Sequence, residues 1–188
     1  MRTNTHVDKP SPTGKFRIKF DNTLQELYKN DPFRFHEWGG IQMFKGSELV
    51  YSRSWDHEDS MEDTIAGMTA NIEWVNDNTL RLAGKYKDSQ ASDTLIITNQ
   101  TDQSICHLNV SLGKYEQFQI LDLVPGQQVL LKINHSPDFL IASGVSDQKN
   151  KFLLNVEDVP KLRELDGVSQ YELEIKQTDL KTTHEEKR

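Results

Sequence analysis

The 188-residue sequence contains one cysteine and no long apolar run. A single cysteine, Cys106, excludes a disulfide within the chain and any zinc site built from several cysteines. The apolar runs are a few residues long, far below the ~18–20 that a membrane-spanning helix needs. The N-terminus also lacks the apolar segment of a signal peptide. We therefore expect no membrane anchor and a cytoplasmic location, unless an export signal has been removed from the chain.

Positive charge is also scarce, with 22 Lys plus Arg against 29 Asp plus Glu and a formal net charge of −7. Binding to phosphate backbones requires clustered cations, so this composition argues against a general affinity for nucleic acid. The sequence has no Gly-rich phosphate loop, HExxH, GxSxG or paired CxxC motif, which argues against the common nucleotide-dependent and hydrolytic enzymes. We predict no cofactor, with a divalent cation as the alternative.

The dominant pattern is alternation of apolar and polar residues with period two, which is typical of strands with one buried face. In residues 15–20, for example, Phe16, Ile18 and Phe20 alternate with three cations. The pattern predicts an all-β, antiparallel β-sandwich. Further strands are expected at 33–44, 49–55, 93–101, 105–112, 118–124, 127–133, 138–142, 151–155 and 171–176, with a tight turn at Pro125-Gly126. Residues 71–75 and 79–82 are expected to form a hairpin around Asn76–Asn78, in which Ile72 and Trp74 face Leu80 and Leu82.

Two short helices and two polar ends complete the predicted organisation. A capping box at Thr23–Glu26 predicts a helix through about Lys29, and Pro160 with Gly167 brackets a second helix at Val159–Leu165. We expect two packed sandwich-like modules, 15–88 and 93–176, or one continuous sandwich with a shared core. Residues 1–14 and 177–188 are expected to be a flexible arm and a flexible tail.

Residues 93–133 carry a family resemblance. A strand ending in Thr98-Asn99, a second alternating strand and a Leu-x-Pro-Gly-Gln turn at 123–127 resemble strands B, C and E of prokaryotic immunoglobulin-like β-sandwich modules. The segment differs from antibody-type domains because it lacks the second cysteine and the core tryptophan. The resemblance implies a fold class and transfers no functional residue.

The densest group of chemistry-bearing residues follows Trp55. It consists of five carboxylates and one histidine within nine residues, namely Asp56, His57, Glu58, Asp59, Glu62 and Asp63. Such carboxylates in a loop can bind a hard cation or a basic protein surface, although the order of an EF-hand is absent. Asp56, His57 and Glu58 are the candidate metal ligands, and the other interpretation is a solvated acidic loop over residues 56–69.

An aromatic segment over Phe33–Gly40 is the second candidate site. If Phe33 and Phe35 face inward on a strand, His36 lies on the outer face, and Trp38 beside two glycines could rim a ligand cleft. His36 and its neighbour Glu37 point to opposite faces of an extended strand, so they cannot act together as an acid–base pair. The alternative is an edge segment held by its aromatic side chains.

These observations favour a non-catalytic protein-binding or assembly protein over an enzyme. The predicted contact residues are Phe33, Phe35, His36, Trp38, Asp56, Glu58, Asp59, Glu62 and Asp63, and the expected partner is another protein with a basic surface. One alternative is a small metal-assisted hydrolase that uses His36 and residues 56–63. Another is a sandwich that binds carbohydrate or a small ligand through Trp38 and Trp55. The sequence does not predict an oligomeric state.

Overall fold

The computed structural model describes residues 2–28, 31–60, 71–83, 93–112, 116–133, 139–157, 159–165 and 168–180. These residues form fourteen strands and one short 3-10 helix, with no α-helix among them, so the predicted all-β class is confirmed. The chain divides into two compact units, Met1–Tyr86 and Lys87–Arg188. Each unit is described by itself below.

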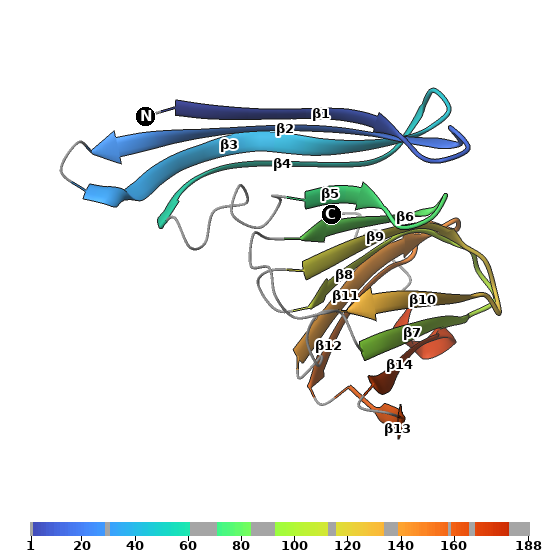
Figure 1. Ribbon diagram of the computed structural model, residues 1–188. Helices are drawn as coiled ribbons and strands as arrows, with labels where there is room; N and C mark the ends of the chain where they lie inside the picture. The colour runs from blue at the N-terminus through green and yellow to red at the C-terminus, as the bar shows by residue number, and fades with distance from the viewer. Residues whose placement is uncertain are drawn as a thin grey trace, which may run out of the picture. The chain divides into compact units, whose positions relative to one another are not determined.

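Unit 1 contains a sheet of four long antiparallel strands, which lie side by side in the order β1-β2-β3-β4 (Figure 1). Alternation gives this sheet one buried apolar face, which includes Ile18, Phe20 and Met43. The strands are β1 (Arg2–Pro10), β2 (Phe16–Tyr28), β3 (Asp31–Lys45) and β4 (Glu48–Ser60).

A hairpin of β5 (Asn71–Trp74) and β6 (Thr79–Ala83) completes unit 1. Its register places Ile72 opposite Leu82 and Trp74 opposite Leu80, as the sequence predicts. The hairpin turn is joined to the β1–β2 turn through Asp77. The Asp77 carboxylate accepts hydrogen bonds from Ser11 Oγ at 2.9 Å and from the backbone N–H of Thr13 at 2.9 Å. The Thr13 hydroxyl also donates to it and holds its pKa below the usual value.

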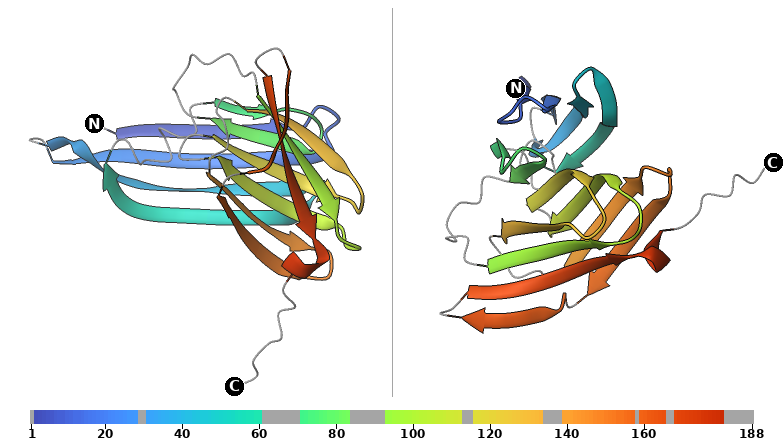
Figure 2. Two further views of the ribbon diagram at one scale, coloured as in Figure 1. Left: turned by 90° about the horizontal axis from the view of Figure 1, so that it is seen from below. Right: turned by 90° about the vertical axis from the view of Figure 1, so that its right-hand side faces the viewer.

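Unit 2 is a β-sandwich, in agreement with the predicted architecture. One sheet has the order β10-β7-β14-β13, and the other contains β12-β11-β8-β9 in that order (Figure 2). The hydrophobic core draws side chains from both sheets, for example Leu95 and Leu173 from one and Leu108 and Phe118 from the other. The strands are β7 (Asp93–Gln100), β8 (Ile105–Leu112), β9 (Glu116–Leu123), β10 (Gln128–Ile133), β11 (Phe139–Ser146), β12 (Lys151–Glu157), β13 (Lys161–Leu165) and β14 (Val168–Lys176).

Both predicted helices are wrong. Residues 23–28 belong to β2, which pairs with β1 on one side and with β3 on the other. Strand β3 pairs with β2 as far as Tyr28 and β1 as far as Gln25, and the backbone hydrogen bonds of this pairing outweigh a local capping pattern. Residues 161–165 form β13 and pair with β14. A helix of seven residues would be marginal without packing of its own, because helix nucleation is costly.

Other predictions are also wrong, and some concern residues that the structure does not describe. Residues 2–10, expected to be an arm without regular structure, form β1. Residues 56–60, expected to begin an acidic loop, extend β4 because they pair with β3. The predicted module boundary at 84–92 and the tail residues 181–188 lie outside the described residues. At the start of the predicted flexible tail, 177–188, residues Gln177–Asp179 instead form the 3-10 helix η1.

Candidate functional site

The two candidate segments of the sequence are neighbours in the sheet of unit 1. Strands β3 and β4 pair so that His36 lies opposite Glu58 and Trp38 lies opposite Asp56. Because side chains alternate along a strand, these four residues share one face of the sheet. The sequence predicted each segment separately, and the strand register brings them together.

The four residues form a compact surface group with Arg2 of β1. His36 Nε2 lies 2.6 Å from Asp56 Oδ1, and the ring centroids of His36 and Trp38 are 4.8 Å apart. The guanidinium of Arg2 lies over the Trp38 ring, 5.3 Å from its centroid, within the range of a cation–π interaction. We call Arg2, His36, Trp38, Asp56 and Glu58 the aromatic–acidic patch.

The patch combines half-buried rings with exposed carboxylates. The side chain of Asp56 is 76% exposed and that of His36 is 36% exposed. Trp38 is half-buried, and Glu58 is exposed and forms no ion pair with a described residue. A tryptophan ring beside the exposed carboxylates of Asp56, which contacts His36, and of Glu58 offers apolar contact area and negative charge at the same place.

Farther along the same face, two carboxylates of unit 1 have cross-strand partners. Arg17 donates two hydrogen bonds to Asp8, each at 2.5 Å, and this contact lowers the pKa of the Asp8 carboxyl. His6 Nδ1 lies 2.5 Å from Asp21 Oδ1 on the neighbouring strand. These pairs join neighbouring strands as the His36–Asp56 contact does, whereas Glu58 of the aromatic–acidic patch forms no ion pair with a described residue.

The opposite face of the same strands holds a polar chain that the sequence analysis missed. Glu37 is fully buried, and its Oε1 accepts a hydrogen bond from Asn22 Nδ2 at 2.6 Å. Asn22 Oδ1 accepts in turn from Trp55 Nε1 at 2.8 Å, and the Trp55 ring packs against Phe20. Trp55 and Trp38 therefore lie on opposite faces of the sheet. Alternation along the sequence predicts that Glu37 and His36 point to opposite faces of the sheet. That the face of Glu37 is the buried one became clear only from the structure, in which β3 pairs with β2.

Several predicted site residues cannot be placed at the level of side chains. The backbones of Phe33, Phe35, His57 and Asp59 belong to β3 and β4, but their side chains are not among the described groups. Glu62 and Asp63 lie outside the described residues altogether. Within the part of the chain that is described, no three His, Cys, Asp or Glu side chains gather as they would around a metal ion. The His36–Asp56 contact supplies two such groups.

Comparison of the chain with models of protein families, with curated proteins and with solved structures finds no match in any of the three. In the ranges that the structure describes, no helix has the length and apolar character needed to cross a bilayer. Any assignment of function therefore depends on the residues and contacts described above.

Proposed function

We propose that this chain is a non-catalytic protein-binding protein whose contact surface is the aromatic–acidic patch. The observation that carries the proposal is the β3–β4 register, which sets Trp38 beside Asp56 and His36 beside Glu58 on one exposed face. Protein interfaces are enriched in aromatic anchors surrounded by polar residues, and this patch has both. The predicted contact residues Phe33, Phe35, Asp59, Glu62 and Asp63 remain part of the proposal.

The expected partner is a protein with a basic surface. Asp56 and Glu58 provide exposed negative charge, and the chain as a whole carries a net charge of −7. Charges of one sign on an exposed face accelerate encounter with an oppositely charged partner, and salt weakens this effect. The cytoplasm remains the proposed compartment, since a chain with a single cysteine gains nothing from an oxidising one.

The two alternative functions have less support. A metal-assisted hydrolase would need a third ligand beside His36 and Asp56, and the described residues supply none. A carbohydrate site built from both tryptophans would require Trp38 and Trp55 on one face of the sheet, whereas they lie on opposite faces. A single stacking platform at Trp38 is compatible with either a peptide or a sugar.

The likeness of residues 93–133 to immunoglobulin-like modules is also kept as a proposal. In the immunoglobulin arrangement, strands B and E share one sheet and strand C lies in the other. Strands β7 and β10 pair in one sheet and β8 lies in the other, which supports that correspondence. Strand β14 departs from it, because it runs parallel to β7 on the side where strand A would lie.

The test is affinity capture from the native cell with matched charge reversals. The double variant Asp56→Lys/Glu58→Lys removes the negative charge of the patch. The control Asp102→Lys/Asp147→Lys makes the same change in net charge at two exposed positions of unit 2. We expect the wild type and the control to retain one stoichiometric partner at low salt, and the patch variant to lose it.

Trp38→Ala is the second variant, and it should weaken capture at least tenfold without changing the dependence on salt. Two results contradict the proposal. One is the absence of any stoichiometric partner at low salt. The other is equal loss of the partner in the patch and control variants, which would show a general effect of charge.

A further inference from the structure

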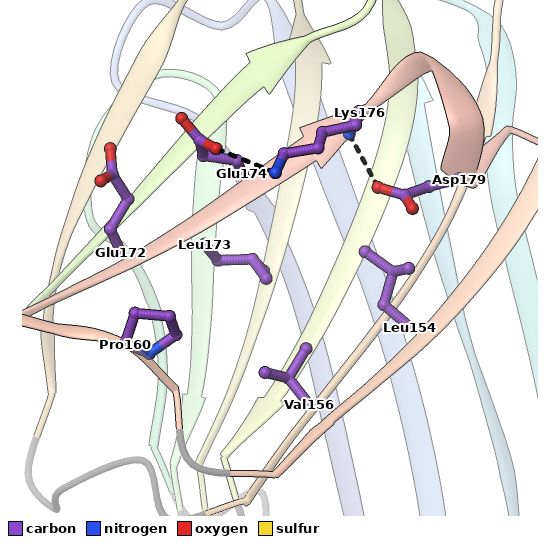
Figure 3. A pocket seen from close by; sticks show the side chains of 8 residues that line it. All are labelled: Leu154, Val156, Pro160, Glu172, Leu173, Glu174, Lys176 and Asp179. Carbon is purple, nitrogen blue, oxygen red and sulfur yellow. Dashed lines mark hydrogen bonds and ion pairs between the residues drawn. The ribbon is translucent and has the colours of Figure 1, made fainter.

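Unit 2 has an open groove between β12, at the edge of one sheet, and β14 of the other sheet. The groove has a volume of about 420 Å³ and is lined by Leu154, Val156, Pro160, Glu172, Leu173, Glu174, Lys176 and Asp179 (Figure 3). Leu154 and Val156 come from β12, at the edge of one sheet, and Leu173 comes from β14 in the other. The groove is therefore an open seam between the two sheets.

The seam exists because β13 is shorter than β14. Strand β13 pairs with β14 only from Lys161↔Tyr171 to Leu165↔Val168. The N–H of Glu172 then donates to Pro160 O at 3.0 Å, and beyond that point no described strand pairs with this side of β14. Strand β7 covers the other side of β14 as far as Lys176.

The open edge of β14 presents a backbone donor to an incoming strand. The N–H groups of alternate residues in a strand point to the same side, so those of Glu172, Glu174 and Lys176 all point away from β7. Glu172 donates to Pro160, and the Lys176 N–H donates to Asp179 Oδ2 at 2.7 Å. The Glu174 N–H forms no hydrogen bond with a described residue. A peptide strand can supply the missing acceptor by adding to the edge.

The walls of the groove specify the chemistry of that strand. Leu154, Val156 and Leu173 form an apolar floor, and Leu173 is 5% exposed. The rim carries three carboxylates, from Glu172, Glu174 and Asp179, against the single cation of Lys176. Lys176 Nζ lies 3.4 Å from Glu174 Oε2, so the rim keeps a net negative charge. An occupant should therefore carry aliphatic side chains toward the floor and basic side chains on the alternate positions.

We propose that this groove binds an extended segment of a partner protein, with alternating aliphatic and basic residues, as a strand added at Glu174, along the open edge between the Pro160 contact at Glu172 and the Asp179 contact at Lys176. The chain's own residues 181–188 do not fit this description, because they include no aliphatic residue. The site is separate from the aromatic–acidic patch and does not depend on the function proposed for it.

The probe is an acetylated, amidated peptide of sequence Ser-Leu-Lys-Val-Lys. In an antiparallel arrangement its first lysine pairs with Glu174, its second lysine lies at the end of the open edge near the Glu172 carboxylate, and its Leu and Val face the floor. Two control peptides are Ser-Leu-Glu-Val-Glu and Ser-Ser-Lys-Ser-Lys. Titration of the full chain followed by ¹H–¹⁵N NMR should shift the amides of Leu173–Lys176, and the lysine–aliphatic peptide should bind at least tenfold more tightly than either control.

Two variants test the charge and the backbone separately. Glu172→Lys/Glu174→Lys should reverse the preference, so that the glutamate peptide binds more tightly, a result that misfolding could not produce. Glu174→Pro removes the edge N–H while Glu174→Ala keeps it, and the proline variant should bind at least tenfold more weakly than the alanine variant. Proline is tolerated where the N–H of an edge strand faces solvent.

Several results would overturn the proposal. Equal binding of the three peptides would show that the groove has no preference for basic and aliphatic residues. Amide shifts confined to β3 and β4 would show that the peptide binds to unit 1 and not to the groove. Shifts of the groove amides on dilution would indicate a second copy of the chain as the occupant. A chain ending at Leu180 that binds the peptide tenfold more tightly would show that the tail fills the groove. None of these outcomes bears on the Asp56→Lys/Glu58→Lys experiment.

Discussion

His107 is a buried titratable residue on the face of β8 that points away from the sandwich core. It is 4% exposed, and its Nε2 donates to Gln119 Oε1 at 2.6 Å, while Gln119 Nε2 donates to Asn109 Oδ1. Burial lowers the pKa of His107 to about 4, and the hydrogen bond to Gln119 opposes this shift. The imidazole is therefore neutral at pH 7.

This shift predicts a loss of stability in mild acid. The unfolded chain takes up a proton at His107 below pH ~6.5, whereas the folded chain resists it until about pH 4. The contribution of His107 to folding is complete above pH ~6.5 and declines as the pH falls toward about 4, by about 3 kcal/mol in total. Urea unfolding at pH 7 and pH 4.5 should show a smaller acid loss for His107→Gln than for the wild type. A His107 imidazole that titrates near pH 6.5 by NMR would contradict this prediction.

Asn99 is a second buried polar residue, and both polar atoms of its side chain form hydrogen bonds. Its Nδ2 donates to the carbonyls of Gln103 and Leu123, and its Oδ1 accepts from the N–H and the hydroxyl of Thr101. Asn99 thus joins the end of β7 to the turn at 101–104 and to the end of β9.

Asn99→Ala should destabilise unit 2 strongly. The substitution removes the Asn99 partner of the Leu123 carbonyl and of the Thr101 N–H, whereas the Gln103 carbonyl still accepts from the Thr101 hydroxyl. Each buried group left without a partner costs about 1–3 kcal/mol. We expect a loss on the order of 3 kcal/mol in the free energy of unfolding, measured in urea. Asn155→Ala, at an exposed position of β12, is the matched control and should change it by less than about 0.5 kcal/mol. Similar losses in the two variants would contradict the role of Asn99.

At the scale of the element, β3 requires a glycine where it meets β2. A Cβ on Gly39 would lie 2.1 Å from the backbone oxygen of Asp21 and 2.9 Å from the Cα of Asn22. At Gly40 the nearest atom, Arg53 O, would be 3.1 Å away. Because the obstacle at Gly39 is backbone, β2 and β3 would have to separate, which would disturb the Asn22–Glu37 hydrogen bond.

Gly39→Ala should therefore cost more stability than Gly40→Ala. Overpacking of this kind costs roughly 1–3 kcal/mol, whereas a shift of a few tenths of an ångström at Gly40 should cost less than about 1 kcal/mol. Amide hydrogen exchange of β2 and β3 provides the local measurement, alongside urea unfolding. Equal protection in the two variants would show that the strands can accommodate the methyl group at Gly39.

At the scale of the whole molecule, charge at sheet edges bears on how strongly copies of the chain associate. Strand β4 is at the edge of its sheet, and edge strands pair with other chains unless charge or shape prevents it. Replacing Asp56 and Glu58 by threonine removes this charge and adds β propensity. We expect Asp56→Thr/Glu58→Thr to increase self-association with concentration, as measured by light scattering. Asp102→Thr/Asp147→Thr is the control, and equal behaviour of the two variants would exclude a protective role for the edge charges.

The sequence identified the two segments that form the aromatic–acidic patch, but it did not predict that they are in contact. Trp38 and His36 stood out as an aromatic segment, and Asp56 and Glu58 as an acidic one, because composition is visible locally. Their contact depends on the register of β3 against β4. Because the sequence predicts a loop at residues 56–69, no pairing of Asp56 and Glu58 with β3 is expected from it. The groove of unit 2 could not be predicted, because it depends on where β13 stops pairing with β14.

The sequence alone determined the all-β class, because alternation with period two is a property of each segment and requires no partner. It also determined the β5–β6 hairpin, whose strands are joined by a short polar turn. Tertiary structure decided that residues 2–10, 23–28 and 161–165 are strands, since a strand's backbone groups are satisfied by neighbours far away in the chain. Pairing between distant segments also decided which polar residues are buried, and so separated Glu37 inside the fold from His36 on its surface.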